Sequence, residues 1–159
     1  MRIALYIGLM CMSLFASKVN LPVELKSWDS LSYVASAKNV SELKDASLTI
    51  NKASYVGLVN TPKIEYIMRP TKEGGTVSYG GMFQIEIKEA GIYRVSLGNA
   101  SWIDLVKEGK AVISVAHNGG AENSGIRKMV DYPLEIGNYI LQFSAGADST
   151  TAVLITKIK

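Results

Sequence analysis

His117 is the only histidine in the chain, and Cys11 is the only cysteine. A structural zinc site takes about four ligands, mostly histidine and cysteine. A non-haem iron site takes two histidines and a carboxylate on one face. One chain of this composition can build neither site, so we predict that the protein holds no metal and no cofactor.

The polar side chains gather after one predicted strand, in a glycine-containing loop that begins at His117. Binding residues often lie in loops that a rigid β-sheet scaffold holds in place. One interpretation is a polar pocket lined by His117, Glu122, Arg127 and Lys128. The alternative is a solvated loop, which its glycines alone would explain, and we favour this alternative.

Arg127 lies near the start of the strand that follows this loop. A guanidinium can hold a carboxylate or a phosphate through two parallel hydrogen bonds. It can equally pair with Asp131 or Asp104 and fasten the loop to the sheet, and this structural pairing is the interpretation we prefer.

Trp102 and Asp104 are two residues apart, so in a strand they project from the same face. An exposed tryptophan beside a carboxylate would suit a sugar-binding surface, although a tryptophan buried in the core is commoner. Tyr79, followed by Gly80 and Gly81, has two interpretations as well: the glycines admit a ligand close to the backbone, or they mark a bulge.

Hydrolytic chemistry has little support in the sequence. No Gly-x-Ser-x-Gly turn is present, and Ser114 is three residues from His117 along a predicted strand. Asp104 and Glu122 could form an acid pair, but nothing in the sequence places them about 5 to 10 Å apart, as glycoside hydrolysis requires. No phosphate-binding loop or dinucleotide fingerprint appears.

The N-terminus has the layout of a secretory signal: Arg2, then an apolar run from Ile3 to Phe15, then the small residues Ala16 and Ser17. We therefore expect a signal peptide over residues 1–17, cleavage near Ala16 to Val19, and a periplasmic or secreted protein with no transmembrane segment after cleavage. Cleavage would remove Cys11 and would lower the formal net charge from +3 to +2. That charge is too small to indicate nucleic acid as a partner.

The rest of the chain predicts strands separated by glycine-containing turns. Apolar residues occupy every second position from Ile64 to Met68, from Phe83 to Ile87, from Tyr93 to Leu97 and from Tyr139 to Phe143, and the positions between them are polar except Ile67 and Ile140. Further strands are expected over 102–106, 111–116, 129–134 and 151–158, with a hairpin turn at 107–110.

These strands predict an all-β antiparallel sandwich, jelly-roll-like and of about nine strands, over residues 46–159. Residues 18–45 are expected to form an extended N-terminal segment with a short helical turn that Asn39 caps. The predicted core residues are Val77, Phe83, Ile85, Tyr93, Val95, Leu97, Ile103, Val112, Val130, Leu141 and Phe143.

Two resemblances to known families extend this interpretation. The turns Gly91-Ile92-Tyr93 and Gly137-Asn138-Tyr139 resemble those of pre-peptidase C-terminal domains and carbohydrate-binding modules. Three motifs resemble a family of small exported proteobacterial proteins that are often labelled homogentisate 1,2-dioxygenase; they are Leu-Pro-x-Glu-Leu-x-x-Trp at 21–28, Gly-Gly-x-Val-Ser-Tyr-Gly-Gly at 74–81, and Ser-Gly-Ile-Arg-Lys-Met-Val-Asp-Tyr-Pro-Leu at 124–134. The dioxygenase label implies an iron held by two histidines and a glutamate, which one histidine cannot supply, so we do not expect that activity.

These observations together favour a non-catalytic periplasmic binding or accessory module for an unknown small molecule, sugar or envelope protein. A small envelope hydrolase using Asp104, Glu122 and His117 is the main alternative. A structural subunit of an envelope complex is the third.

Overall fold

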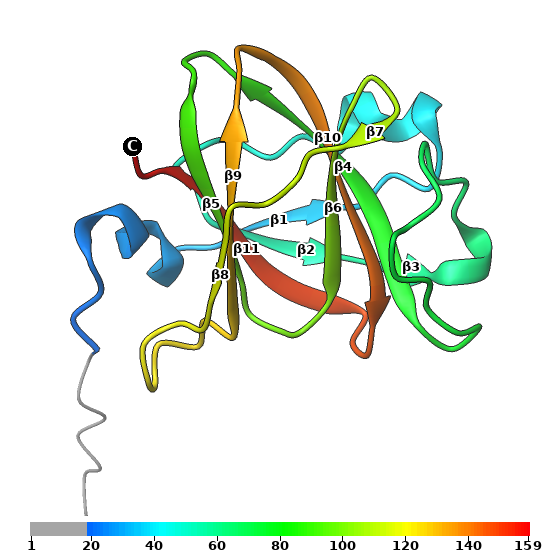
Figure 1. Cartoon of the computed structure of the whole chain (residues 1–159). Helices are drawn as coiled ribbons and strands as arrows, with labels where there is room; N and C mark the ends of the chain where they lie inside the picture. The colour runs from blue at the N-terminus through cyan, green and yellow to red at the C-terminus, as the bar shows by residue number, and fades with distance from the viewer. Residues whose placement is uncertain (1–18) are drawn as a thin grey trace, which may run out of the picture.

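The computed structural model describes residues 19–159 and shows two β-sheets packed face to face (Figure 1). The predicted signal peptide and Cys11 lie outside the described residues. The six-stranded sheet has the order β1 (Ser32–Ala35), β2 (Ser54–Gly57), β11 (Thr150–Lys157), β5 (Gly91–Leu97), β9 (Lys128–Leu134) and β8 (Ala116–Asn118). The five-stranded sheet has the order β3 (Val59–Asn60), β4 (Tyr79–Ile87), β10 (Gly137–Gly146), β6 (Trp102–Lys107) and β7 (Lys110–Ala111).

The all-β sandwich predicted from the sequence is confirmed, with eleven strands among residues 19–159 in place of about nine. In this part of the chain all strand pairs are antiparallel except β1 with β2. β1 lies within the segment 18–45, so strands of the sandwich begin upstream of residue 46. The rest of this segment holds two short 3₁₀ helices, η1 (Val23–Asp29) and η2 (Val40–Asp45), and η3 (Thr61–Lys63) follows β3.

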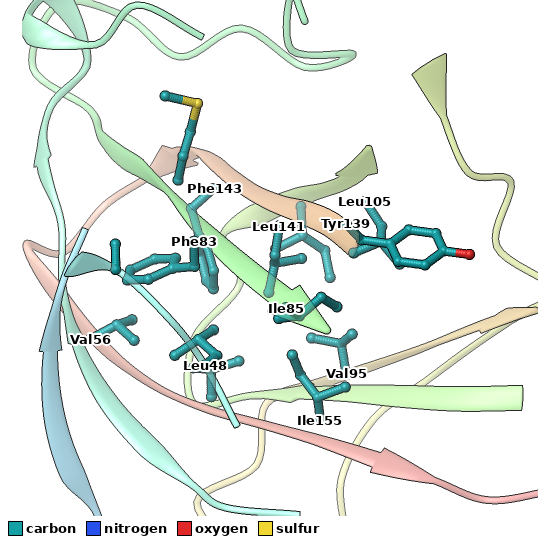
Figure 2. Close-up of a cluster of buried hydrophobic side chains, with 14 of the residues drawn as sticks. Leu48, Val56, Phe83, Ile85, Val95, Leu105, Tyr139, Leu141, Phe143 and Ile155 are labelled. Atoms are coloured by element: carbon teal, nitrogen blue, oxygen red, sulfur yellow. The ribbon is translucent and has the colours of Figure 1, made fainter. Parts of the chain in front are cut away.

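The core lies between the two sheets and follows from the alternation of side chains along each strand. Phe83 and Phe143 meet there edge to face, with ring centroids 5.6 Å apart. Figure 2 shows side chains from both sheets converging on this layer, including Leu141 and Ile155. Ten of the eleven predicted core residues are buried in this cluster or pack against it. Val77 is the exception, because it lies in the loop before β4 and is 84% exposed.

Two local predictions are confirmed. Asn39 caps η2 by accepting a hydrogen bond from the Glu42 backbone N–H. Between β6 and β7 the hairpin turn has Glu108 at φ 50° and Gly109 at φ 75°. A two-residue turn with positive φ at both positions matches the right-handed twist of the strands it joins.

Two strand predictions are wrong. The segment from Ile64 to Met68 alternates like a strand, yet it is irregular and lies on the outer face of the five-stranded sheet. The predicted strand 111–116 is interrupted: β7 ends at Ala111 and β8 begins at Ala116.

The segment around η1 packs on the outer face of the six-stranded sheet. Leu21, Leu25 and Trp28 form a second apolar cluster there with Ile126 and Leu154. Figure 1 shows η1, in blue, beside the sheet that contains β5, β9 and β11. Each sheet is therefore covered on its outer face by part of the chain.

Candidate functional site

Polar side chains hold the loop between η3 and β4 on the outer face of the five-stranded sheet. Gln142 in β10 is fully buried; its Nε2 donates to the Met68 carbonyl at 2.9 Å, and its Oε1 accepts from the Met68 N–H at 3.2 Å. Ser144 Oγ donates to the Lys72 carbonyl at 2.8 Å. Buried polar groups need such partners, so these outward-facing side chains fix where residues 68–72 lie.

Asp104 in β6 is the third anchor of this loop. It is 6% exposed and accepts from the Thr71 N–H at 2.9 Å and from Thr71 Oγ1 at 2.5 Å. Trp102 Nε1 donates to Thr71 Oγ1 at 2.6 Å and lies 3.2 Å from an Asp104 oxygen. The three side chains thus form a chain of donation from the indole through the hydroxyl to the carboxylate. Asp104 is engaged in holding the loop.

Trp102 has a ring that is partly exposed and that two lysines approach. Lys128 Nζ lies 5.0 Å from the ring centroid and Lys72 Nζ lies 5.9 Å from it. Both distances are within the range of a cation–π interaction. Lys72 comes from the anchored loop and Lys128 from the start of β9 in the other sheet, so the site is built where the two sheets meet.

The electrostatics at Trp102 are positive. Burial lowers the pKa of Lys128, and the nearby charge of Lys72 lowers it further, while Asp104 opposes the shift. Lys128 Nζ donates to the Ser101 carbonyl at 3.1 Å. Among the ion pairs of residues 19–159, none includes Lys72 or Lys128. We call Thr71, Lys72, Ser101, Trp102, Asp104 and Lys128 the Trp102 site.

Three of the residues predicted from the sequence therefore come together in the structure: Trp102, Asp104 and Lys128. The placement of Trp102 and Asp104 on one strand face is confirmed. Sequence reasoning missed Thr71 and Lys72, because they lie about 30 residues away in a segment predicted only as a connection. Their one signal is the Thr71-Lys72 polar pair after Pro70, which is too common to single out.

The other predicted residues do not join this site. His117 is exposed on β8, the edge strand, and its Nε2 lies 2.8 Å from Ser114 Oγ. The sequence placed Ser114 and His117 apart along an extended strand; the break in that strand before Ala116 brings them together. Glu122 and Arg127 are exposed in the following loop.

The predicted pairing of Arg127 with Asp131 or Asp104 is wrong. Asp131 is engaged by Arg94 in the neighbouring strand β5, whose Nε and Nη2 lie 2.7 and 2.8 Å from its two oxygens. Asp104 is occupied by Thr71. Arg127 is fixed instead through its backbone N–H, which donates to the Leu97 carbonyl.

The glycines after Tyr79 admit a side chain of the protein itself. A Cβ atom at Gly80 would collide with the Tyr66 hydroxyl and with the Phe143 carbonyl oxygen. Tyr66 Oη donates to that carbonyl at 2.7 Å, and burial raises the pKa of Tyr66 to about 12. Tyr79 itself pairs with Gly146 beyond a register shift whose extra residue lies in β10, between Phe143 and Gly146, so the bulge lies opposite the glycines and not at them.

A hollow of about 740 Å³ lies at the end of the sandwich where β10 begins, while Trp102 pairs with Ser144 near the other end of β10. Two ion pairs lie on its rim, Lys157 with Glu89 and Lys88 with Glu86. None of the seven predicted site residues lines it. It therefore adds nothing to the Trp102 site.

Within residues 19–159, no group of three or more histidine, cysteine, aspartate or glutamate side chains is placed to hold a metal ion. In the same range no helix is long and apolar enough to cross a bilayer.

Comparisons with known proteins give little more. No protein-family model matches the chain, and no curated protein matches it. Among solved structures, a β-glucosidase from Paenibacillus barengoltzii is similar to 79% of the chain at 13% identity, with a TM-score of 0.29. The chain spans 13% of the length of that β-glucosidase. A similarity at this level supports no inference about activity.

Proposed function

We propose that the protein is a non-catalytic binding module of the bacterial periplasm whose ligand binds at the Trp102 site. One observation carries the proposal: a partly exposed indole with two lysines over it and no acidic partner for either among the described residues. Ligand sites commonly combine an apolar surface with a few placed polar groups. The turns that resemble those of carbohydrate-binding modules are in line with a sugar ligand.

The acid–base groups that the sequence offered for hydrolysis, Asp104, Glu122 and His117, are not available together at this site. A general acid or base must reach the substrate with an available oxygen or nitrogen, whereas Asp104 is directed at Thr71 and Trp102. His117 lies on an edge strand, and Glu122 in the exposed loop after it. These contacts favour binding over the hydrolase that the sequence left open.

A thermal-shift screen against envelope sugars, short peptides and divalent metals tests the proposal, because a ligand that binds only the folded state raises Tm. We expect a ligand whose Tm shift is lost in Trp102→Ala and retained in the control Lys52→Ala, a change in an exposed turn. A shift that survives Trp102→Ala would place the ligand elsewhere. The absence of any shift that depends on Trp102 would refute the proposal.

One contact keeps a second candidate function open. The Ser114–His117 distance of 2.8 Å is that of a nucleophile and its base. Among residues 19–159 no hydrogen bond joins the ring of His117 to a carboxylate that would orient it, and the histidine is exposed. Turnover of p-nitrophenyl acetate that is abolished by both Ser114→Ala and His117→Ala would favour a hydrolase over the binding module.

A further inference from the structure

We propose that the Trp102 site recognises an acidic sugar, with a carboxylate or phosphate group held by Lys72 and Lys128 and the sugar ring resting on Trp102. This inference rests on the proposed function and adds the chemical class of the ligand. It is carried by three features of the site: its excess of positive charge, its fixed geometry and its aromatic surface.

The charge of the site calls for an anion. Both ammonium groups lie within 6 Å of one ring centroid, and neither forms an ion pair within the described residues. Asp104 is the carboxylate within this arrangement, but its oxygens face Thr71 and the indole N–H. An anionic ligand would relieve the repulsion between the two lysines. Burial is the main cause of the lowered pKa of Lys128, and the charge of Lys72 lowers it further.

The site is also organised before a ligand arrives. Lys128 is partly buried, and its ammonium donates one hydrogen bond to Ser101, which leaves two of its three N–H donors available. The backbone at Lys72 is held by Ser144, and the preceding residue, Thr71, is held by Asp104. Fixing these groups in advance reduces the entropy lost on binding. Only the exposed side chain of Lys72 has to become ordered when the anion binds.

The indole selects for a ring. Its N–H is already bonded to Thr71, so Trp102 offers a ligand no further donor and only the part of its aromatic surface that the two lysines leave exposed. Aromatic rings in sites with one apolar and one wet side contact the apolar faces of ligands while polar groups stay solvated. A pyranose that carries an acidic substituent supplies both an apolar face and a charge. Lysine acts as a point charge without the forked geometry of arginine, so carboxylate and phosphate suit it equally.

Isothermal titration tests the inference with four probes: glucuronate, glucose 1-phosphate, glucose and inorganic phosphate. We expect glucuronate, glucose 1-phosphate or both to bind at least about tenfold more tightly than glucose and than inorganic phosphate, a difference of about 1.4 kcal/mol. The first two probes separate a carboxylate from a phosphate as the preferred acidic group. Binding should weaken as salt is added, because screening reduces the attraction between charges.

Two variants locate the binding. Lys72→Ala and Lys128→Met should each weaken the acidic sugar about tenfold, and Lys52→Ala should leave it unchanged. Lys72 is exposed, so its removal should not affect folding; this keeps the test valid if Lys128→Met is destabilised. Equal affinity for glucose and glucuronate, or no effect of either lysine variant, would overturn the inference. So would equal affinity for inorganic phosphate and glucose 1-phosphate, because the ring would then contribute nothing.

The two proposals fail in different ways. A neutral ligand whose binding is lost in Trp102→Ala but retained in Lys72→Ala would overturn the acidic sugar and leave the binding module in place. The absence of any binding that depends on Trp102, across these probes and the wider screen, would refute the binding module itself.

Discussion

Replacing Asp104 with alanine removes the acceptor for both the backbone N–H and the hydroxyl of Thr71. Hydrogen bonds to a carboxylate contribute about 1.5 to 3 kcal/mol each. The lower figure applies here because Thr71 is exposed, so two bonds give about 3 kcal/mol. That is a large share of the roughly 5 to 15 kcal/mol by which a domain is stable.

Urea unfolding followed by tryptophan fluorescence measures this loss. With a slope of about 1 to 3 kcal/mol per molar urea, the midpoint for Asp104→Ala should fall by about 1 to 3 M. The Trp102 emission of the folded variant should also shift to longer wavelength, because the loop that meets its ring is released. Asp148→Ala, which changes an exposed carboxylate after β10, should have little effect.

The result that would refute this reasoning is a loss below about 1 kcal/mol, comparable to an ordinary surface substitution. Asp104 would then not be what holds the loop. A double-mutant cycle with Thr71→Val isolates the hydroxyl contact, which should show a coupling energy of about 1 kcal/mol.

Three further predictions follow from contacts elsewhere in the sandwich. Gly80→Ala should destabilise the fold by about 3 kcal/mol in the same urea assay, since its new methyl group meets backbone, whereas Gly75→Ala, which meets nothing within 4 Å, should be nearly neutral. In an alkaline absorbance titration Tyr66 should ionise near pH 12, and Tyr66→Phe should remove that step. The folded pKa of Tyr66, about 12, lies above the ordinary value of 10.0. The stability that the neutral hydroxyl contributes is therefore present below pH 10 and is lost as the pH rises through 12. The free energy of unfolding of Tyr66→Phe should accordingly depend less on pH between 10 and 12. Asp131→Ala should lower the free energy of unfolding by about 3 kcal/mol, because it leaves Arg94 partly buried without its carboxylate. Replacing both residues with apolar ones should lower it by less, and equal losses in the two variants would contradict the pairing argument.

The strands that the sequence predicted best are those with one face in the core. Phe83 and Ile85 in β4, and Leu141 and Phe143 in β10, alternate with polar residues and end at glycine turns. The same two-residue period placed Trp102 beside Asp104. Alternation is local, so a single sequence reveals it.

The segment from Ile64 to Met68 shows where this reasoning stops. It alternates like a strand, but its backbone forms no strand ladder: Met68 bonds to the side chain of Gln142, and the Glu65 N–H donates to the Lys38 carbonyl. Whether a segment pairs with another strand depends on the arrangement of the whole sheet and not on the segment's own sequence. Alternation therefore indicated burial at this segment but not regular structure.

The Trp102 site could be predicted only in part for a related reason. Lys128 was expected to act with His117 and Glu122, its neighbours in sequence. In the structure the Lys128 ammonium lies over the ring of Trp102, the first residue of β6 in the other sheet. The strand order and the packing of the two sheets decide this contact, and neither can be read from periodicity.

The position of the last two strands bears on how the chain acquires its shape. β10 lies between β4 and β6, and β11 lies between β2 and β5, so the final strands occupy the interior of both sheets. Until they are synthesised, each sheet is two separate fragments with no partner across the gap. Strand pairing over such sequence distances is slow. A chain built in this order completes neither sheet until its last two strands have been synthesised.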